Sequence, residues 1–149
     1  MITVQDAGTP RTITRIRVKQ AGVLRDVSVV TVRDGDTNRV VFAGALEVNA
    51  GFAYAEGPSS TLTTNTTTAN ASGGIPPYSY QWVRTASTGT PSTASNAAMA
   101  STSFTKTNVP NGTLQNDTWQ VTVTDAVGQT ATDATIVGFS NTTTLGGGL

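Results

Sequence analysis

The first 43 residues of the chain contain three copies of one 14-residue pattern. Residues 2–15 read ITVQDAGTPRTITR, residues 16–29 read IRVKQAGVLRDVSV, and residues 30–43 read VTVRDGDTNRVVFA. A repeat this short cannot bury its apolar side chains within itself, so it must stack on its neighbours or on another chain. The pattern therefore favours a protein built for assembly over one built for catalysis.

Within each copy, apolar and polar residues alternate with the period of a strand that has one buried face. We predict three linked β-hairpins. Their turns are expected at Ala7-Gly8, Ala21-Gly22 and Gly35-Asp36. Val27 and Val30 cannot point the same way on one regular strand, so we expect a corner or a β-bulge where two copies join. Three hairpins barely make a core, and the module is expected to dock onto itself or onto a larger assembly.

The composition limits the chemistry that this chain can perform. Of its 149 residues, 12% are charged, and the formal net charge is zero. The sequence contains no cysteine and no histidine, which excludes disulfides, thiolate metal sites and the most frequent general base. A serine nucleophile would have no histidine to activate it. We therefore predict that the protein is not an enzyme and needs no cofactor.

The charges are divided unevenly along the chain. Residues 1–44 hold seven Lys and Arg against four Asp, giving +3, whereas residues 45–149 hold two against five Asp and Glu, giving −3. We predict that the basic segment docks onto an acidic protein surface, and a solvated hairpin face is the alternative. No aromatic residues interleave with the arginines to stack on bases, so we expect no nucleic acid partner. The candidate docking residues are Arg11, Arg15, Arg17, Arg25 and Arg39.

Membrane and secretion signals are not visible in the sequence. No apolar run approaches the roughly 20 residues that span a bilayer. The N-terminus has no basic segment followed by an apolar run. We therefore expect neither membrane insertion nor a secretory leader.

Residues 45–140 are predicted to form a second, all-β domain, followed by a flexible tail at 141–149. The clearest alternation lies in residues 117–125, where apolar side chains point one way and Thr and Gln the other. Residues 59–72 are almost pure Thr, Ser, Asn and Ala. We favour a strand there with Leu62 and several Thr methyls inward, and a disordered stalk is the alternative. The other strands are expected at 44–57, 78–84, 99–109 and 130–139, with a polar loop at 86–96.

Two pieces of this second domain, GGIPPYSYQW at residues 73–82 and the strand pair around 119–136, resemble an immunoglobulin-like sandwich of the polycystic-kidney-disease type. The resemblance implies that Trp82 is the buried tryptophan of the third strand and that the usual tyrosine-corner position falls on Trp119. Val121 stands where antibody domains have their second cysteine, so the disulfide is missing and Trp82 would pack on aliphatic side chains. The predicted core residues are Trp82, Trp119, Val121 and Val123.

The phrase RTITRIRV at residues 11–18 resembles segments of tailed-bacteriophage structural proteins, which often carry an appended immunoglobulin-like domain. The resemblance implies a virion protein of the tail or tail tip, present in many copies. Its first module would dock on other virion structural proteins, and its sandwich would be displayed outward. Self-association into a trimer or ring would cover exposed strand edges. Two other functions stay open: a capsid decoration protein, and a bacterial adhesin or carbohydrate-binding module.

Aromatic residues offer one further ligand hypothesis. A sugar-binding face can be built from such side chains, although at this density they more often form the core of a small sandwich. We place Trp82 and Trp119 in the core. Tyr78 adjoins the proline turn, and we keep it as a candidate for weak adhesion to host surface glycans. The aromatic residues considered are Tyr78, Tyr80, Trp82, Phe104 and Trp119.

Pairs of carboxylates are the remaining candidates for chemistry. Asp34 and Asp36 lie in a predicted turn, where Asp is common because it bonds the backbone. Asp125 and Asp133 flank a predicted hairpin and offer oxygen ligands to Ca²⁺. The sequence has no dense loop of alternating Asp residues, so we predict no metal site.

Overall fold

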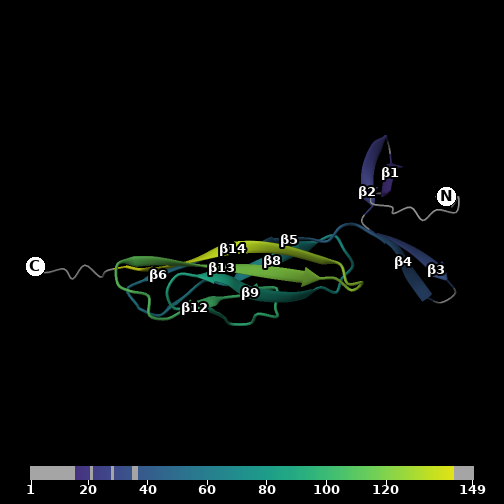
Figure 1. Cartoon of the computed structure of the whole chain (residues 1–149). Coiled ribbons are helices and arrows are strands. Elements are labelled where there is room, and N and C mark those ends of the chain that lie inside the picture. The colour runs from purple at the N-terminus through teal and green to yellow at the C-terminus, as the bar shows by residue number, and fades with distance from the viewer. Residues whose placement is uncertain (1–15, 21, 28, 35–36, 143–149) are drawn as a thin grey trace, which may run out of the picture. The chain divides into compact units, whose positions relative to one another are not determined.

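The computed structural model of the chain is shown in Figure 1. The structure describes the backbone of residues 16–20, 22–27, 29–34 and 37–142. Every regular element in these ranges is a strand, which confirms the predicted all-β class. The chain divides into two compact units, Met1–Ala45 and Leu46–Leu149, one residue after the boundary predicted at residue 44. Within the described ranges, no helix has the length and hydropathy needed to cross a membrane.

In its described residues, the first unit has two antiparallel hairpins, one in the second copy of the repeat and one in the third. Their strands are β1 (Ile16–Gln20), β2 (Val23–Val27), β3 (Val29–Asp34) and β4 (Thr37–Ala43). Arg25 pairs with Val18 in one hairpin and Arg39 pairs with Val32 in the other, so equivalent repeat positions hold equivalent registers. The first copy of the repeat lies outside the described residues, and the module of three hairpins stays a prediction.

Two local features shape these hairpins. Gly22 has a φ of 83°, a left-handed conformation that tight hairpin turns require and that most side chains resist. The register of β3 on β4 shifts between Val30 and Thr31. This irregularity lies just inside the third copy, close to the junction where a bulge was expected. Such a shift bends the strand and increases its twist.

The second unit is a two-layer β-sandwich. One layer has four strands in the order β6, β14, β13, β9, and β6 runs parallel to β14 while the other pairs are antiparallel. These strands are β6 (Ala53–Gly57), β14 (Thr130–Asn141), β13 (Thr113–Thr124) and β9 (Ser79–Ser87). On β13, Trp119, Val121 and Val123 are buried because successive side chains of a strand point to opposite faces of the sheet.

The other layer consists of six short strands. They are β5 (Glu47–Ala50), β7 (Leu62–Thr63), β8 (Thr67–Ser72), β10 (Thr93–Ala94), β11 (Ser101–Thr102) and β12 (Phe104–Lys106). β8 lies between β5 and β11, and β12 lies between β7 and β10. β7 and β8 follow each other along the chain, as do β11 and β12, so the two ladders continue one another. The resulting strand order is that of an immunoglobulin-like sandwich.

The segments around residue 51 differ in part from their predictions. Residues 44–57 do not form one strand, because the chain leaves one layer after β5 and enters the other as β6. Gly51 lies at this break, where a Cβ atom would come within 2.5 Å of Thr67 Oγ1 and 3.0 Å of the Thr68 carbonyl oxygen. The Thr-rich segment 59–72 does form strands, with Leu62, Thr67 and Ala69 buried.

Two loop and tail boundaries also need correction. The polar loop expected at 86–96 contains β10 and the fully buried Ser92. The last strand extends to Asn141, whose Nδ2 donates to the Val109 carbonyl oxygen at 2.7 Å. The tail predicted at 141–149 therefore begins too early, and residues 143–149 lie outside the described residues.

Three aromatic rings join the two layers. Phe104 of β12 lies 5.7 Å from Trp82 at an interplanar angle of 75°, and 4.8 Å from Trp119 at 40°. Trp82, which was expected to pack on aliphatic side chains, also meets an aromatic ring from the facing layer. The indole nitrogen of Trp82 donates to the Met99 carbonyl oxygen at 3.0 Å. Edge-to-face and tilted contacts of this kind stabilise a core beyond the area that they bury.

Candidate functional site

The structure places only part of the predicted arginine docking set. Arg11 and Arg15 lie outside the described residues. Arg17 is paired with Asp26 on the first described hairpin, and Arg25 occupies the next register position. Arg39 lies on the second described hairpin. The repeat therefore gives each of these hairpins an arginine at the same register, while their common docking role stays a prediction.

Tyr78 is not a free adhesive side chain in this structure. Its ring packs against the core, and its hydroxyl donates to the Gly73 carbonyl oxygen at 2.5 Å. The hydroxyl thus closes the turn that precedes β9, and the half-buried ring offers little surface to a ligand. The four predicted core residues, in contrast, are 5% exposed or less: Trp82, Trp119, Val121 and Val123.

Asp125 and Asp133 each bond backbone groups instead of sharing a ligand. Asp125 accepts hydrogen bonds from the amides of Ile75, Val127 and Gln129 at 2.8–3.0 Å. Asp133 accepts one from the Ala50 amide at 2.8 Å. The described residues contain no group of three or more acidic side chains arranged to hold a metal ion.

The carboxylate of Asp125 pins the turn before β9 to the turn after β13. Burial opposes ionisation, but the amides of Ile75, Gln129 and Val127 outweigh it and hold the pKa of Asp125 below its ordinary value. The Asp125 carboxylate comes so close to this turn that position 74 must be a glycine. Gly74 has a φ of 55°, and a Cβ atom added to it would lie 2.9 Å from Asp125 Oδ2. Asp125 thus has a structural role, because its hydrogen bonds join the two turns.

Replacing Gly74 by alanine is expected to cost about 1–3 kcal/mol of unfolding free energy, because strain and a steric contact add. Gly128→Ala is the matched control, since Gly128 also has a positive φ, 85°, but a Cβ atom there meets nothing within 4 Å. It should cost about 1 kcal/mol from backbone strain alone. Urea unfolding of both variants measures the difference, and equal losses would show that the contact with Asp125 is unimportant.

A buried ion pair lies further back along β13, at Asp117. Lys106 Nζ is 2.5 Å from Asp117 Oδ1, and both side chains are fully buried. Ser87 Oγ donates to the same oxygen at 2.8 Å, and the Ser92 amide donates to Oδ2 at 2.7 Å. The Ser92 hydroxyl also donates to Oδ2 and accepts the indole N–H of Trp119 at 3.0 Å. We call Ser92, Lys106 and Asp117 the buried polar cluster; Ser87, which borders it, is exposed.

The buried polar cluster connects both layers through an ion pair and hydrogen bonds. Lys106 comes from β12, Asp117 from β13 and Ser87 from the end of β9. Ser92 is held from outside by Arg84, whose guanidinium donates to its carbonyl oxygen and lies 5.7 Å from the centre of the Trp119 ring. Paired in this way, the charges are compatible with burial. Because neither side chain of the ion pair is exposed to solvent, the cluster acts on the packing of the two layers.

Acidification should therefore weaken the sandwich. Burial alone would raise the pKa of Asp117, but the Lys106 ammonium and the hydrogen bonds from Ser92 and Ser87 outweigh it and hold the pKa below the ordinary 3.8. A carboxyl whose pKa is lowered in the folded state stabilises the protein above its unfolded pKa and loses that contribution as pH falls through the folded value. Urea unfolding between about pH 6 and about pH 2 should show the loss beginning below about pH 4. Constant stability across this range would contradict the ion pair.

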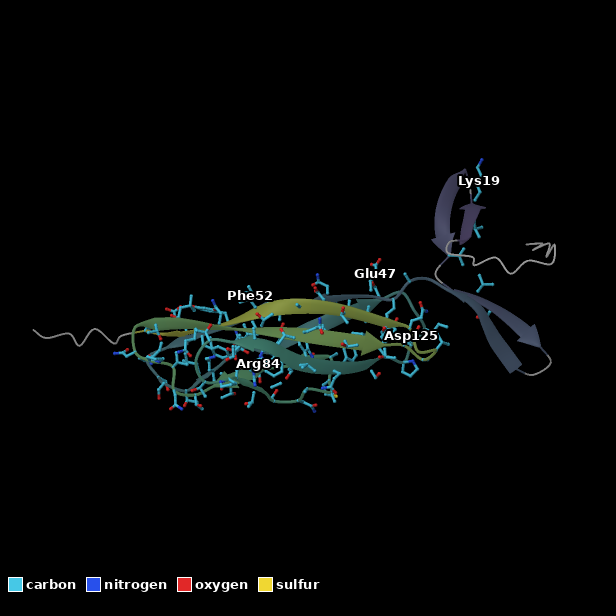
Figure 2. The ribbon with its side chains drawn as sticks, in the orientation of Figure 1. Lys19, Glu47, Phe52, Arg84 and Asp125 are labelled. Atoms are coloured by element: carbon cyan, nitrogen blue, oxygen red, sulfur yellow. The ribbon has the colours of Figure 1, made fainter. Side chains whose placement is uncertain are left out.

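One surface feature was not predicted from the sequence, the pair Phe52 and Tyr54. Phe52 is 76% exposed and Tyr54 is 37% exposed. Their rings are stacked, with centroids 6.3 Å apart and an interplanar angle of 16°. Figure 2 shows Phe52 on the outside of the sandwich. We call these two residues the outer aromatic pair.

Comparison with known proteins gives little further information. No protein-family model matches the chain, and no curated protein matches it. A solved structure with some likeness is a nucleoside hydrolase-related hypothetical protein from Saccharophagus degradans that is associated with carbohydrate metabolism. The match has a TM-score of 0.42 and 16% identity, and covers 75% of this chain and 25% of that one. This low TM-score assigns neither a fold family nor an activity.

Proposed function

We propose that this chain is a non-enzymatic structural protein of a tailed-phage virion, a component of the tail or tail tip. Its hairpin unit docks on other virion proteins, and its sandwich is displayed outward for weak adhesion to host surface glycans. The observation that carries this proposal is the contrast between the two units. The sandwich has a complete core of its own, whereas Val18 on the first described hairpin is 43% exposed.

The hairpin unit has the properties of a docking element. A two-stranded hairpin is marginally stable by itself and gains stability by packing on another surface. Residues 1–44 carry a charge of +3, which favours an acidic partner surface. Val18 and Arg25 form one cross-strand pair, and Val32 and Arg39 form another. An apolar and a basic residue thus recur together in the two described hairpins, so each hairpin offers a partner the same pair of residue types. We expect a trimer or a ring.

The sandwich is suited to display. Its ion pair at Asp117 and the hydrogen bonds of the Asp125 carboxylate hold β13 and the turn after it in place. Weak adhesion by one copy becomes effective when many copies act together on one particle. The non-enzymatic part of the proposal rests on the absence of histidine and cysteine from the sequence and on the inaccessible position of Lys106 and Asp117.

Removing residues 1–45 tests the docking role. The truncated protein should remain folded, with an unchanged unfolding midpoint, because the second unit has its own core. It should be monomeric in sedimentation analysis and should no longer join particles in a complementation assay. Incorporation of the truncated protein would contradict the docking role. Loss of folding would contradict the independence of the two units.

A further inference from the structure

The outer aromatic pair lies on the outward face of the layer formed by β6, β14, β13 and β9. Tyr54 pairs with Gly138 across β6 and β14, and Gly138 pairs with Asn116 across β14 and β13. A Cβ atom on Gly138 would lie 2.8 Å from Tyr54 Cδ2 and 3.2 Å from Cε2. One edge of the Tyr54 ring therefore rests directly above a bare stretch of backbone. Glycine inside a strand commonly marks such a close approach.

Polar atoms adjoin the rings. The Tyr54 hydroxyl donates to Glu56 Oε2 at 3.3 Å, so the carboxylate is held beside the ring. On the other side of Gly138, the side-chain oxygen of Asn116 lies 3.4 Å from the same Cβ position. Glu56 and Asn116 are both exposed. Two nearly parallel rings with hydrogen-bonding groups at their margin are what a sugar ring needs, since its C–H groups rest on the negative face of an aromatic ring while its hydroxyls bond at the edge.

Size and charge restrict the occupant further. A stable protein interface buries about 800 Å² on each partner, far more than two side chains provide. The outward positions of β13 from Asn116 to Thr122 are polar, namely Asn116, Thr118, Gln120 and Thr122, whereas Leu114 on β13 and Ile136 on β14 are exposed apolar side chains on the same face. Residues 45–149 carry a charge of −3, and Glu56 itself is acidic. An uncharged sugar therefore fits better than an acidic one.

We infer that the outer aromatic pair is a binding site for a neutral hexopyranose unit, which stacks on Phe52 and Tyr54 and hydrogen-bonds to Glu56 and Asn116. This inference rests on the adhesive part of the proposed function and replaces Tyr78 as its contact residue. It is independent of where on a particle the chain is located. Binding by a single copy is weak, because the platform is open and holds only one face of the sugar.

Nuclear magnetic resonance titration of the full chain tests the site. The probes are maltotriose, cellotriose and N,N′-diacetylchitobiose, with glucuronic acid as the acidic comparison. We expect saturable shifts for at least one neutral probe at the amides of residues 52–56, 116 and 138, and weaker shifts for glucuronic acid. Phe52→Ala and Tyr54→Ala should each weaken binding by about threefold to tenfold.

Two further variants separate the aromatic site from general effects. Gly138→Ala retains both rings but displaces Tyr54, and should also weaken binding. Val83→Ala removes an apolar side chain that is 52% exposed on the same layer, and should leave binding unchanged. All four variants are first checked for an unchanged thermal transition, and Gly138→Ala decides the result if an aromatic variant does not fold.

Three results would overturn the inference in distinguishable ways. Sugar shifts elsewhere that survive Phe52→Ala would move the site while leaving the adhesive function in place. A concentration of about 50 mM makes even the weakest useful monovalent contacts measurable. If no probe causes a shift at that concentration, both the sugar site and the adhesive function are contradicted. Shifts of residues 52–56 that depend on protein concentration without sugar would identify the pair as a contact between copies of the chain.

Discussion

Replacing Asp117 by alanine should destabilise the sandwich by about 3–5 kcal/mol, because it leaves the Lys106 ammonium buried without its counter-charge. The nearest remaining oxygen that bonds Lys106 is Ser87 Oγ at 3.4 Å, and the Phe139 ring lies 5.6 Å from Nζ. Neither replaces a carboxylate. The Ser92 amide and hydroxyl lose their acceptor at the same time, which adds the cost of an unpaired buried donor.

Replacing the other partner of the ion pair, Lys106→Met, is the matched control. It leaves Asp117 with its hydrogen bonds from Ser87 and Ser92, and methionine fills the space of the lysine chain. We expect a smaller loss than for Asp117→Ala, since a paired acceptor is retained. The double variant should cost less than the sum of the two single changes, because the residues interact directly. Urea unfolding measures all three, and a loss below about 1 kcal/mol for Asp117→Ala would contradict the buried pair.

Replacing Phe104 by alanine should cost about 3–5 kcal/mol, the usual range for a fully buried phenylalanine. The ring is completely buried and contacts both tryptophans, one edge-to-face and the other tilted. Its removal leaves a cavity between the layers, which the short strands on either side cannot close without losing their register. The environments of Trp82 and Trp119 change together, so the fluorescence of the native state should also shift.

Met99→Ala is the control for this substitution. The Met99 side chain is 56% exposed, and only its carbonyl oxygen takes part in the core, as the acceptor for the Trp82 indole. Alanine keeps that carbonyl, so the change should remain within about 0.5 kcal/mol. Similar losses for Phe104→Ala and Met99→Ala would show that the aromatic contact between the layers is not what holds the sandwich together.

The strands of the sandwich were predictable where one face is apolar and the other polar. Trp119, Val121 and Val123 alternate with polar residues, and this pattern alone defines the inner face of β13. Trp82 follows from the same reasoning on β9. The strands of the Thr-rich segment were harder to predict, since its composition also suits a linker. Its strands form because β-branched threonine fits a pleated, half-buried surface.

Asp117 could have been identified as an inward residue, because it has the same parity on β13 as Trp119. A charged residue at an inward position requires a partner, and Lys106 has the same parity on β12 as Phe104. What sequence alone does not provide is the pairing itself, since Ser87, Ser92, Lys106 and Asp117 come from different parts of the chain. Their meeting depends on how the two layers face each other.

The outer aromatic pair was not predictable from periodicity. Leu46 and Val48 point inward before Gly51, whereas Ala53 and Ala55 do so after it. The parity changes because the chain crosses from one layer to the other at Gly51, which turns Phe52 and Tyr54 outward. A hydrophobicity pattern places the larger apolar residues inside, and only the position of the crossing shows that two alanines take that role instead.

We propose that the chain belongs to a virion and displays its sandwich there. Immunogold electron microscopy of particles from a culture that makes this protein, with an antibody against residues 45–149, tests it most directly. We predict gold on the tail or its tip. Gold confined to the head would contradict the tail location in favour of capsid decoration, and intact particles without any gold would contradict the virion assignment itself.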